Sequence, residues 1–225
     1  DGDSGLGLVV APFAMNIAIE KSKSVGTGWV SVQNSNHFGI AAHHAMMALK
    51  HDMIGLSMTN ASPLVVPTFS IDKMLGTNPI CVAAPAENEP AFVADLATTT
   101  AANGKLEILQ RKNADTPLGW VQDKDGNATT DANILKKGGA LLPLGGDREH
   151  GSHKGYALGA IVDIFSALLS GANYAPWVPP FPAYVPIPAQ QPGKGIGHFL
   201  GAMRIDAFRP ADEFKQHMDN WIKGF

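Results

Sequence analysis

The alternation of apolar and polar residues predicts helices and strands along most of the chain. Apolar residues at helical spacing, with charged residues between them, predict a helix over 8–25 that ends at Gly26. Short apolar runs bounded by turn residues predict strands, and other stretches repeat the helical pattern. The expected strands are 28–34, 53–59, 80–84, 92–97 and 199–205, and the further expected helices are 39–50, 106–112, 154–170 and 210–223.

The order strand, helix, strand over residues 28–59 predicts a βαβ unit and therefore an α/β fold with parallel neighbouring strands. The helix over 154–170 is almost wholly apolar, which predicts a central position. Two segments lack periodicity. Residues 113–140 are polar and predict long surface turns, whereas 171–192 are rich in proline and aromatic residues and predict an irregular loop that covers a site or meets a second subunit.

Composition narrows the classes of protein. The 225 residues are 45% apolar and 16% charged, with a net charge of −3, as in a globular protein. No basic stripe with interleaved aromatic residues is present, so a nucleic-acid partner is not expected. No apolar run has the length of a membrane span. The single cysteine, Cys81, lies in an apolar run, which predicts a small core residue and excludes a disulfide framework.

Several common catalytic patterns are absent from the sequence. The dinucleotide-binding fingerprint G-x-G-x-x-G does not occur after any predicted strand, and no glycine-rich phosphate loop ends in lysine followed by serine or threonine. The nucleophile elbow, G-x-S-x-G, is also absent. The pairs His43–His44 and His150–His153 lack carboxylates at ligand spacing, so no metal site is expected. The polar beginning of the chain reads as the middle of a loop, and we expect a piece of a longer protein, truncated at both ends.

The segment 34–39, NSNHFG, is the most informative part of the chain. It joins a predicted strand to a predicted helix, a place where α/β proteins present polar side chains to a ligand. His37 is the side chain there that exchanges a proton near neutral pH. In the alternative interpretation, Asn34 and Ser35 cap the helix and His37 is solvated on its first turn.

Three further polar clusters follow strands or precede helices, at 59–63, 95–99 and 143–155. Asp95 ends an apolar strand, where it either accepts a hydrogen bond from a ribose hydroxyl or caps a helix. Lys154 and Gly155 begin a predicted helix, whose free backbone N–H groups favour an anion. An ordinary turn with an exposed lysine is the alternative interpretation of that cluster.

These clusters carry a family resemblance. Segments 34–39 (NSNHFG), 76–79 (GTNP), 95–99 (DLATT), 142–146 (LPLGG) and 154–156 (KGY) occur in this order, and the chain resembles the type 2 malate/L-lactate dehydrogenase family over essentially its whole length. Ureidoglycolate, sulfolactate, diketogulonate and cyclic imine enzymes belong to the same family. The resemblance implies one NAD(P)-binding and catalytic region over 1–225. It also implies a non-Rossmann α/β fold with a largely antiparallel sheet flanked by helices, in place of the parallel arrangement.

The resemblance also implies a function. It indicates NAD- or NADP-dependent hydride transfer between a small 2-hydroxy acid, of malate or lactate type, and its 2-oxo acid. A ureidoglycolate or sulfolactate dehydrogenase, a cyclic imine reductase, and an inactive fragment that acts as a binding or assembly module are the alternatives. A cytoplasmic homodimer is implied, with no membrane or nucleic-acid partner.

Site residues are carried over by motif. His37 matches a histidine assigned as proton acceptor in some members, and Asn60, Ser62 and His198 fall beside the substrate region. Asp95, Leu96, Ala97, Thr98, Lys154 and Gly155 match cofactor-binding segments. The chain departs from the family pattern in three places. An N-terminal Ser-His-Gly motif with its arginine and a C-terminal cofactor segment have no counterpart, and 147–153 resembles an insertion that alters the pocket.

Overall fold

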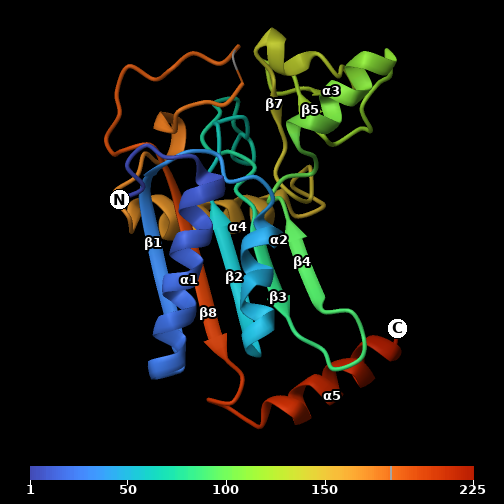
Figure 1. Cartoon of the computed structure of the whole chain (residues 1–225). Helices are drawn as coiled ribbons and strands as arrows, with labels where there is room; N and C mark the ends of the chain where they lie inside the picture. Colours follow the sequence, from blue (N-terminus) through green and yellow to red (C-terminus); the bar gives the residue numbers. More distant parts are fainter. Residues whose placement is uncertain (183) are drawn as a thin grey trace.

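A five-stranded antiparallel sheet forms the centre of the molecule, with the strand order β1-β8-β2-β3-β4 (Figure 1). The computed structural model describes residues 1–182 and 184–225. The strands of this sheet are β1 (Thr27–Ser35), β2 (Met53–Thr59), β3 (Ile80–Ala84), β4 (Phe92–Leu96) and β8 (Ile196–Arg204). A three-stranded antiparallel sheet consists of β5 (Val121–Gln122), β6 (Ala128–Thr129) and β7 (Ala140–Leu141).

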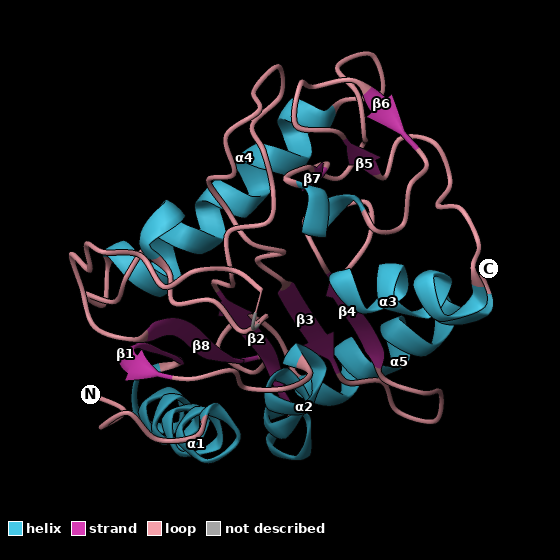
Figure 2. Ribbon diagram, turned by 90° about the horizontal axis from the view of Figure 1, so that it is seen from above, coloured by secondary structure: helices cyan, strands magenta, loops and turns pink. Residues whose placement is uncertain are grey.

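Helices cover both faces of the main sheet (Figure 2). The α-helices are α1 (Gly7–Val25), α2 (Ala41–Ala45), α3 (Asn103–Lys112), α4 (Ser152–Asp163) and α5 (Ala211–Lys223). Short 3₁₀ segments span Met46–His51, Ile134–Lys137 and Ala175–Trp177, and a π-helical segment, Ile164–Leu168, continues α4. Helices α1 and α2 lie on one face of the sheet, and α4 with its π segment lies on the other.

The core under α1 follows from its sequence. Ala11, Met15, Ala18 and Ile19 recur at helical spacing and are buried against β1 and β8. The small side chains of the two alanines let the helix lie close to these strands. Cys81 is fully buried in β3, which confirms the prediction of a core residue. Burial and the nearby Asp95 raise the pKa of its thiol to about 12, so the thiol stays protonated near neutral pH.

The strand directions bring several polar segments to one edge of the sheet. Strands β1, β2 and β4 run in one direction, and β3 and β8 run in the other, because every neighbouring pair is antiparallel. The ends of β1, β2 and β4 therefore lie at the same edge as the beginnings of β3 and β8, the upper edge in Figure 1. The segments that follow or precede these strand ends are 36–39, 60–62, 76–79 and 97–99.

The antiparallel sheet confirms the fold that the family resemblance implies, and the parallel βαβ expectation is wrong. Strands β1 and β2 do point the same way, but β8 lies between them and pairs with both. This neighbour comes from more than 130 residues farther along the chain, as the register Val32–His198 and Thr59–His198 shows. Local periodicity carries no information about such a long-range pairing.

Two further expectations are corrected. The polar stretch 113–140 holds the strands β5 and β6 and the first residue of β7 as well as turns. Each of these strands is only two residues long, so it leaves no periodic signal in the sequence. The helix expected over 154–170 is not central. Its apolar side chains are partly buried on the sheet, and those exposed by 39% or more are Leu158, Ile161, Ile164, Phe165, Leu168 and Leu169.

No helix among the described residues is long and apolar enough to cross a membrane.

Two glycines allow α4 to lie close to the loops at the polar edge. A Cβ atom on Gly155 would lie 2.2 Å from the carbonyl oxygen of Leu144, and one on Gly159 would lie 3.0 Å from the hydroxyl of Thr98. The carbonyl of Leu144 belongs to the backbone and cannot move aside as the end of a flexible side chain could. The packing of α4 against residues 142–146 therefore requires glycine at position 155.

We expect Gly155→Ala to lower the free energy of unfolding by about 1–3 kcal/mol, because the added methyl group overpacks this contact. Urea denaturation measures the effect. The matched control is Gly104→Ala in α3, where an added Cβ meets nothing within 4 Å. The control should be neutral or stabilise by up to about 1 kcal/mol. Equal stability of Gly155→Ala and the wild type would contradict the close packing of α4.

Candidate active site

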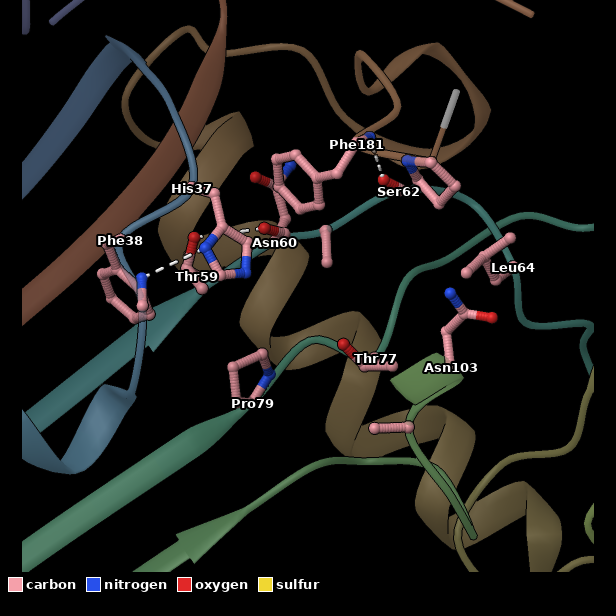
Figure 3. Close-up of a pocket in the computed structure, with 14 residues that line it drawn as sticks. His37, Phe38, Thr59, Asn60, Ser62, Leu64, Thr77, Pro79, Asn103 and Phe181 are labelled. Carbon is pink, nitrogen blue, oxygen red and sulfur yellow. Dashed lines mark hydrogen bonds between the residues drawn. The ribbon is translucent and has the colours of Figure 1, made fainter. Parts of the chain in front are cut away.

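A cavity of about 260 Å³ opens at the polar edge of the sheet (Figure 3). The segments after β1 and β2, the segment before β3, the start of α3 and the loop before residue 183 surround it. Its lining combines polar and apolar residues, which are His37, Phe38, Gly39, Thr59, Asn60, Ala61, Ser62, Leu64, Thr77, Pro79, Ala102, Asn103, Phe181 and Pro182. His37 is the one residue with a titratable side chain in this set.

His37 has a defined orientation in the cavity wall. Its Nδ1 accepts a hydrogen bond of 3.1 Å from the backbone N–H of Gly39. Gly39 has φ +79°, in the left-handed region, and this turn of the backbone aims its N–H back at the imidazole. The ring nitrogen Nε2 makes no hydrogen bond among the described residues, and Figure 3 shows it facing the cavity. Burial lowers the pKa of His37 below its ordinary value.

The loop that contains Phe181 closes one side of the cavity. The backbone N–H of Phe181 donates a hydrogen bond of 2.6 Å to the hydroxyl oxygen of Ser62. The rings of Phe181 and His37 meet edge to face, with centroids 4.7 Å apart. Ser62 therefore holds the loop in place, and Phe181 supplies an aromatic wall beside the imidazole.

Asn60 lies at the cavity, but its side-chain amide is used within the protein. Its Nδ2 donates to Asp163 (3.2 Å) and to the carbonyl of Asn173 (2.7 Å), and its Oδ1 accepts from the N–H of Gly197 (3.0 Å). The second carboxylate oxygen of Asp163 accepts from the N–H of Ala175. Burial raises the pKa of Asp163, although these donors favour the carboxylate. The network joins the end of β2 to α4 and to the start of the loop that carries Phe181.

His198 lies behind the cavity rather than in its lining. The side chain is fully buried, with Nδ1 2.8 Å from Thr59 Oγ1 and Nε2 2.8 Å from Ser35 Oγ. The Thr59 hydroxyl also lies within hydrogen-bond distance of the carbonyls of Gly197 (2.9 Å) and Asn60 (3.1 Å), so it links the imidazole to the backbone of both residues. The structure thus ties His198 to the ends of β1 and β2 and leaves no ring nitrogen for a substrate.

A stack of three rings supports the backbone next to His37. The ring of Phe38 lies between His44, with centroids 4.6 Å apart, and His198, with centroids 4.8 Å apart. His44 Nε2 also bonds the carbonyl of Phe38 at 2.7 Å. Burial lowers the pKa of His44, and it lowers the pKa of His198 to about 3. These two histidines are therefore neutral near pH 7 and hold Phe38 by packing and hydrogen bonds.

The segment 95–98 lies beside α2 and α4. Asp95 is exposed, and its Oδ2 accepts from the backbone N–H of Ala42 at 2.9 Å, so the carboxylate caps α2. Leu96 is exposed by 57%, and Ala97 is partly buried. Thr98 is buried and donates to the carbonyls of Thr77 and Asn78, which fixes the segment that enters the cavity.

Lys154 and Gly155 lie in the first turn of α4. This helix begins without a side-chain cap, and Lys154 is exposed, whereas Gly155 is buried against Leu144. The backbone N–H of Leu144 donates to the carbonyl of Thr98 at 3.0 Å. The two predicted cofactor segments, 95–98 and 154–155, are therefore joined through residues 143–144 at the polar edge of the sheet.

Sequence reasoning missed four residues that shape the site. Thr77 and Asn103 line the cavity, Phe181 packs on His37, and Asp163 holds Asn60. Thr77 lies in the 76–79 segment that carried the resemblance, so a signal was available for it. Phe181 and Asp163 lie in an aperiodic loop and in an apolar helix, and only the tertiary structure brings them to the site.

The residues of the cavity fit the nicotinamide ring of a cofactor. The hydroxyl of Thr77 and Nε2 of His37 make no hydrogen bond among the described residues, whereas Leu64, Pro79 and Phe181 provide apolar surface. A flat ring with a polar carboxamide needs this combination of apolar and hydrogen-bonding contacts.

The fold and the cavity together define a class of protein. It has an antiparallel α/β sheet without a glycine fingerprint, and a histidine faces a cavity of the size of a small polar ligand. The chain belongs to the malate/L-lactate dehydrogenase family, because the sequence profile of that family matches residues 1–225. This match confirms the resemblance that the motifs indicated.

Individual relatives are similar over nearly the whole chain. Malate dehydrogenase of Pyrococcus horikoshii is 45% identical over 224 residues, which cover 99% of this chain and 60% of the relative. L-sulfolactate dehydrogenase of Methanocaldococcus jannaschii is 39% identical over 223 residues, which cover 99% and 60%. The solved structure of the Pyrococcus horikoshii malate dehydrogenase superposes with a TM-score of 0.84 at 41% identity, covering 100% of this chain and 59% of that one. The chain thus spans about three fifths of the length of these relatives.

The buried His198 makes the free energy of unfolding depend on pH. Its pKa is about 3 in the folded chain, against about 6.5 in an unfolded chain, so the unfolded chain takes up a proton first as the pH falls. The stabilisation from this group is complete above about pH 6.5 and is lost as the pH falls toward 3. Between about pH 7 and pH 5 we expect a loss on the order of 2 kcal/mol from His198.

Urea denaturation at both pH values measures this loss. His198→Asn should have a lower free energy of unfolding at neutral pH. Its free energy of unfolding should also change less between the two pH values, because asparagine does not bind the proton. His153→Gln is the control, because His153 is exposed. In this variant the free energy of unfolding should change with pH as it does in the wild type. An unchanged slope in His198→Asn would contradict a buried, neutral His198.

The cap on α2 predicts a structural effect of Asp95. We expect Asp95→Ala to lower the free energy of unfolding by about 1 kcal/mol, because the N–H of Ala42 loses its acceptor. Asp95→Asn keeps an oxygen acceptor and should lose less. Denaturation curves for the two variants test the cap, and equal loss in both would show that charge rather than hydrogen bonding matters.

Proposed function

We propose that the protein is an NAD- or NADP-dependent dehydrogenase that interconverts a small 2-hydroxy acid, of malate or lactate type, and its 2-oxo acid. Membership of the malate/L-lactate dehydrogenase family supports the reaction class. The orientation of His37 at the cavity is the observation that carries the assignment of the site. Malate and L-sulfolactate are the substrates named for two similar relatives, and both are 2-hydroxy acids.

His37 is proposed to contact the oxygen on C2 of the substrate through Nε2. Ser62 and Asn60 hold the cavity wall from behind, because their polar atoms bond the loop at Phe181 and the network around Asp163. The neutral His198 supports the same wall from the sheet side. The substrate-side roles of Asn60, Ser62 and His198 are thus proposed to be those of positioning residues.

A bound reduced nicotinamide supplies a hydride to C2 of the oxo acid. Asp95, Leu96, Ala97 and Thr98, with Lys154 and Gly155, are proposed to hold this cofactor. The exposed Lys154 beside the uncapped N-terminus of α4 suits the cofactor phosphates. Asp95 has one carboxylate oxygen without a protein partner among the described residues, which suits a ribose hydroxyl.

We further propose a cytoplasmic homodimer, as the family resemblance implies. The exposed apolar side chains along α4 and its π segment support a contact with another protein surface, since large apolar patches of this kind usually mark an interface. Light scattering of the purified chain measures the subunit number directly.

The test is titration of the chain with NADH and with NADPH, followed by nicotinamide fluorescence, and then addition of oxaloacetate or pyruvate. We expect saturable binding of one cofactor and its oxidation when the acid is added. His37→Ala should bind the cofactor but turn over slower by about 10²-fold or more. The control is His217→Ala, because His217 is exposed on α5 at the opposite end of the sheet.

Unchanged turnover in His37→Ala would contradict the assignment of the site. Failure of the wild-type chain to bind either cofactor would contradict the proposed activity of these 225 residues and favour the alternative of a binding module.

A further inference from the structure

We propose that Asp163 is a positioning residue, whose carboxylate holds the segment 175–182 against the cavity, so that binding of cofactor and substrate depends on it. This segment is called the strap below. The inference rests on the proposed dehydrogenase function for the identity of the ligands, whereas the position of the strap is a property of the chain without ligands. Asp163 is the last residue of α4 and is not part of the cavity lining, so it acts through the groups that it binds.

The two carboxylate oxygens of Asp163 have different partners. Oδ1 accepts from the side-chain amide of Asn60 at 3.2 Å, and Oδ2 accepts from the backbone N–H of Ala175 at 2.9 Å. Asn60 lines the cavity directly after β2, and Ala175 is the first residue of the strap. One buried side chain on α4 therefore fixes a residue of the cavity wall and the beginning of the strap relative to each other.

A carboxylate is needed at position 163 because both of its partners are N–H donors. Both terminal atoms of the side chain must then be acceptors, and aspartate meets this requirement. Asparagine has the same shape but offers one acceptor, so its amide group would face one of the two donors. Asp163 is buried, and a donor left without an acceptor in this place loses stabilisation that water does not replace.

The backbone at the beginning of the strap is strained. Ala175 has φ +48°, in the left-handed region that residues with a Cβ atom rarely adopt. Such a conformation persists where its surroundings hold it, and two contacts do so here. Asp163 accepts from the N–H of Ala175, and Asn60 donates to the carbonyl of Asn173 at 2.7 Å. Without the carboxylate we expect the backbone at residue 175 to relax and to carry the strap away from the cavity.

The far part of the strap is anchored at the cavity itself. The N–H of Phe181 donates to the hydroxyl oxygen of Ser62, two residues after Asn60, as Figure 3 shows. Beyond residue 183, the hydroxyl of Tyr184 donates to Asn103 Oδ1 at 3.1 Å. The strap thus leads from the end of α4 past the cavity toward the start of α3, and Asp163 sets its starting point.

Displacement of the strap should weaken binding more than it slows turnover. Phe181 and Pro182 give the cavity part of its apolar wall, which contacts a ligand before and during the reaction alike. Loss of such a wall raises KM and leaves kcat nearly unchanged. We expect Asp163→Asn to raise the Kd of the cofactor and the KM of the acid by about tenfold or more, because a hydrogen bond to a charged group is lost.

Limited proteolysis of the chain without ligands tests the position of the strap directly. Chymotrypsin cleaves after aromatic residues, and the bond between Trp177 and Val178 lies in the strap. In the wild type Val178 is buried and Trp177 is partly buried against Tyr174, so this bond should be protected. Asp163→Asn should be cleaved there faster by about tenfold or more. Mass spectrometry identifies the fragments, and cleavage after the exposed Phe208 is the internal reference.

A second variant reaches the same contact from the strap and leaves the buried carboxylate in place. Ala175→Pro removes the N–H that Asp163 accepts, and proline cannot adopt φ +48°. It should give the same increase in cleavage after Trp177 and the same loss of cofactor affinity as Asp163→Asn. This variant decides the question even if Asp163→Asn does not fold.

The matched control is Asp219→Asn in α5. Asp219 is also a buried carboxylate that holds a loop, since it accepts from the backbone N–H groups of Glu87, Asn88 and Glu89. This loop lies at the opposite edge of the sheet (Figure 1). The control should lose stability but keep the wild-type cofactor Kd and the wild-type cleavage after Trp177. A purely structural role of Asp163 would give this same result in Asp163→Asn.

The two measurements separate this inference from the proposed function. Cleavage is measured without cofactor or acid, so it reports on the strap whether or not the chain turns over. Faster cleavage in Asp163→Asn and Ala175→Pro, with a wild type that binds neither NADH nor NADPH, would support the strap and count against the dehydrogenase. Wild-type cleavage in both variants would overturn the role of Asp163, and so would an unchanged cofactor Kd in a chain that binds the cofactor.

Discussion

The insertion of β8 between β1 and β2 is the constraint on which the site depends. β8 pairs antiparallel with both neighbours, and His198, at its beginning, bonds Ser35 at the end of β1 and Thr59 at the end of β2. A one-residue shift in register would turn His198 to the other face of the sheet and separate these two strand ends. The segments with His37 and Asn60 follow these strand ends, so this one register sets their distance.

Neutral, buried polar groups hold the site together. His198 bonds two hydroxyl groups, Asn60 bonds backbone groups and the Asp163 carboxylate, and His44 bonds the carbonyl of Phe38 through Nε2. The ring of Phe38 fills the space between the two histidines. Buried groups of this kind are costly when a partner is missing, so each fixes its neighbours in one arrangement. His37 then presents one ring nitrogen to the cavity, while the protein occupies the other.

The sequence predicted the local elements better than their assembly. The strands 53–59 and 80–84 have the predicted bounds, because apolar runs between turn residues mark them clearly. β8 begins three residues earlier than predicted, since Gly197 and His198 interrupt its apolar run. The motif at 34–39 located the site, but the roles of Phe181, Ser62 and Asp163 depend on contacts between segments more than 100 residues apart. Periodicity within one segment holds no record of such contacts.

The most direct test of this account is a crystal structure of the chain with reduced nicotinamide cofactor and oxamate, an unreactive analogue of a 2-oxo acid. The account predicts the nicotinamide ring and oxamate in the cavity lined by Thr77 and Phe181, with the oxamate oxygen at hydrogen-bond distance from His37 Nε2 and Gly39 N–H still on Nδ1. Oxamate bound away from His37, or an imidazole rotated off Gly39 to meet it, would contradict the account.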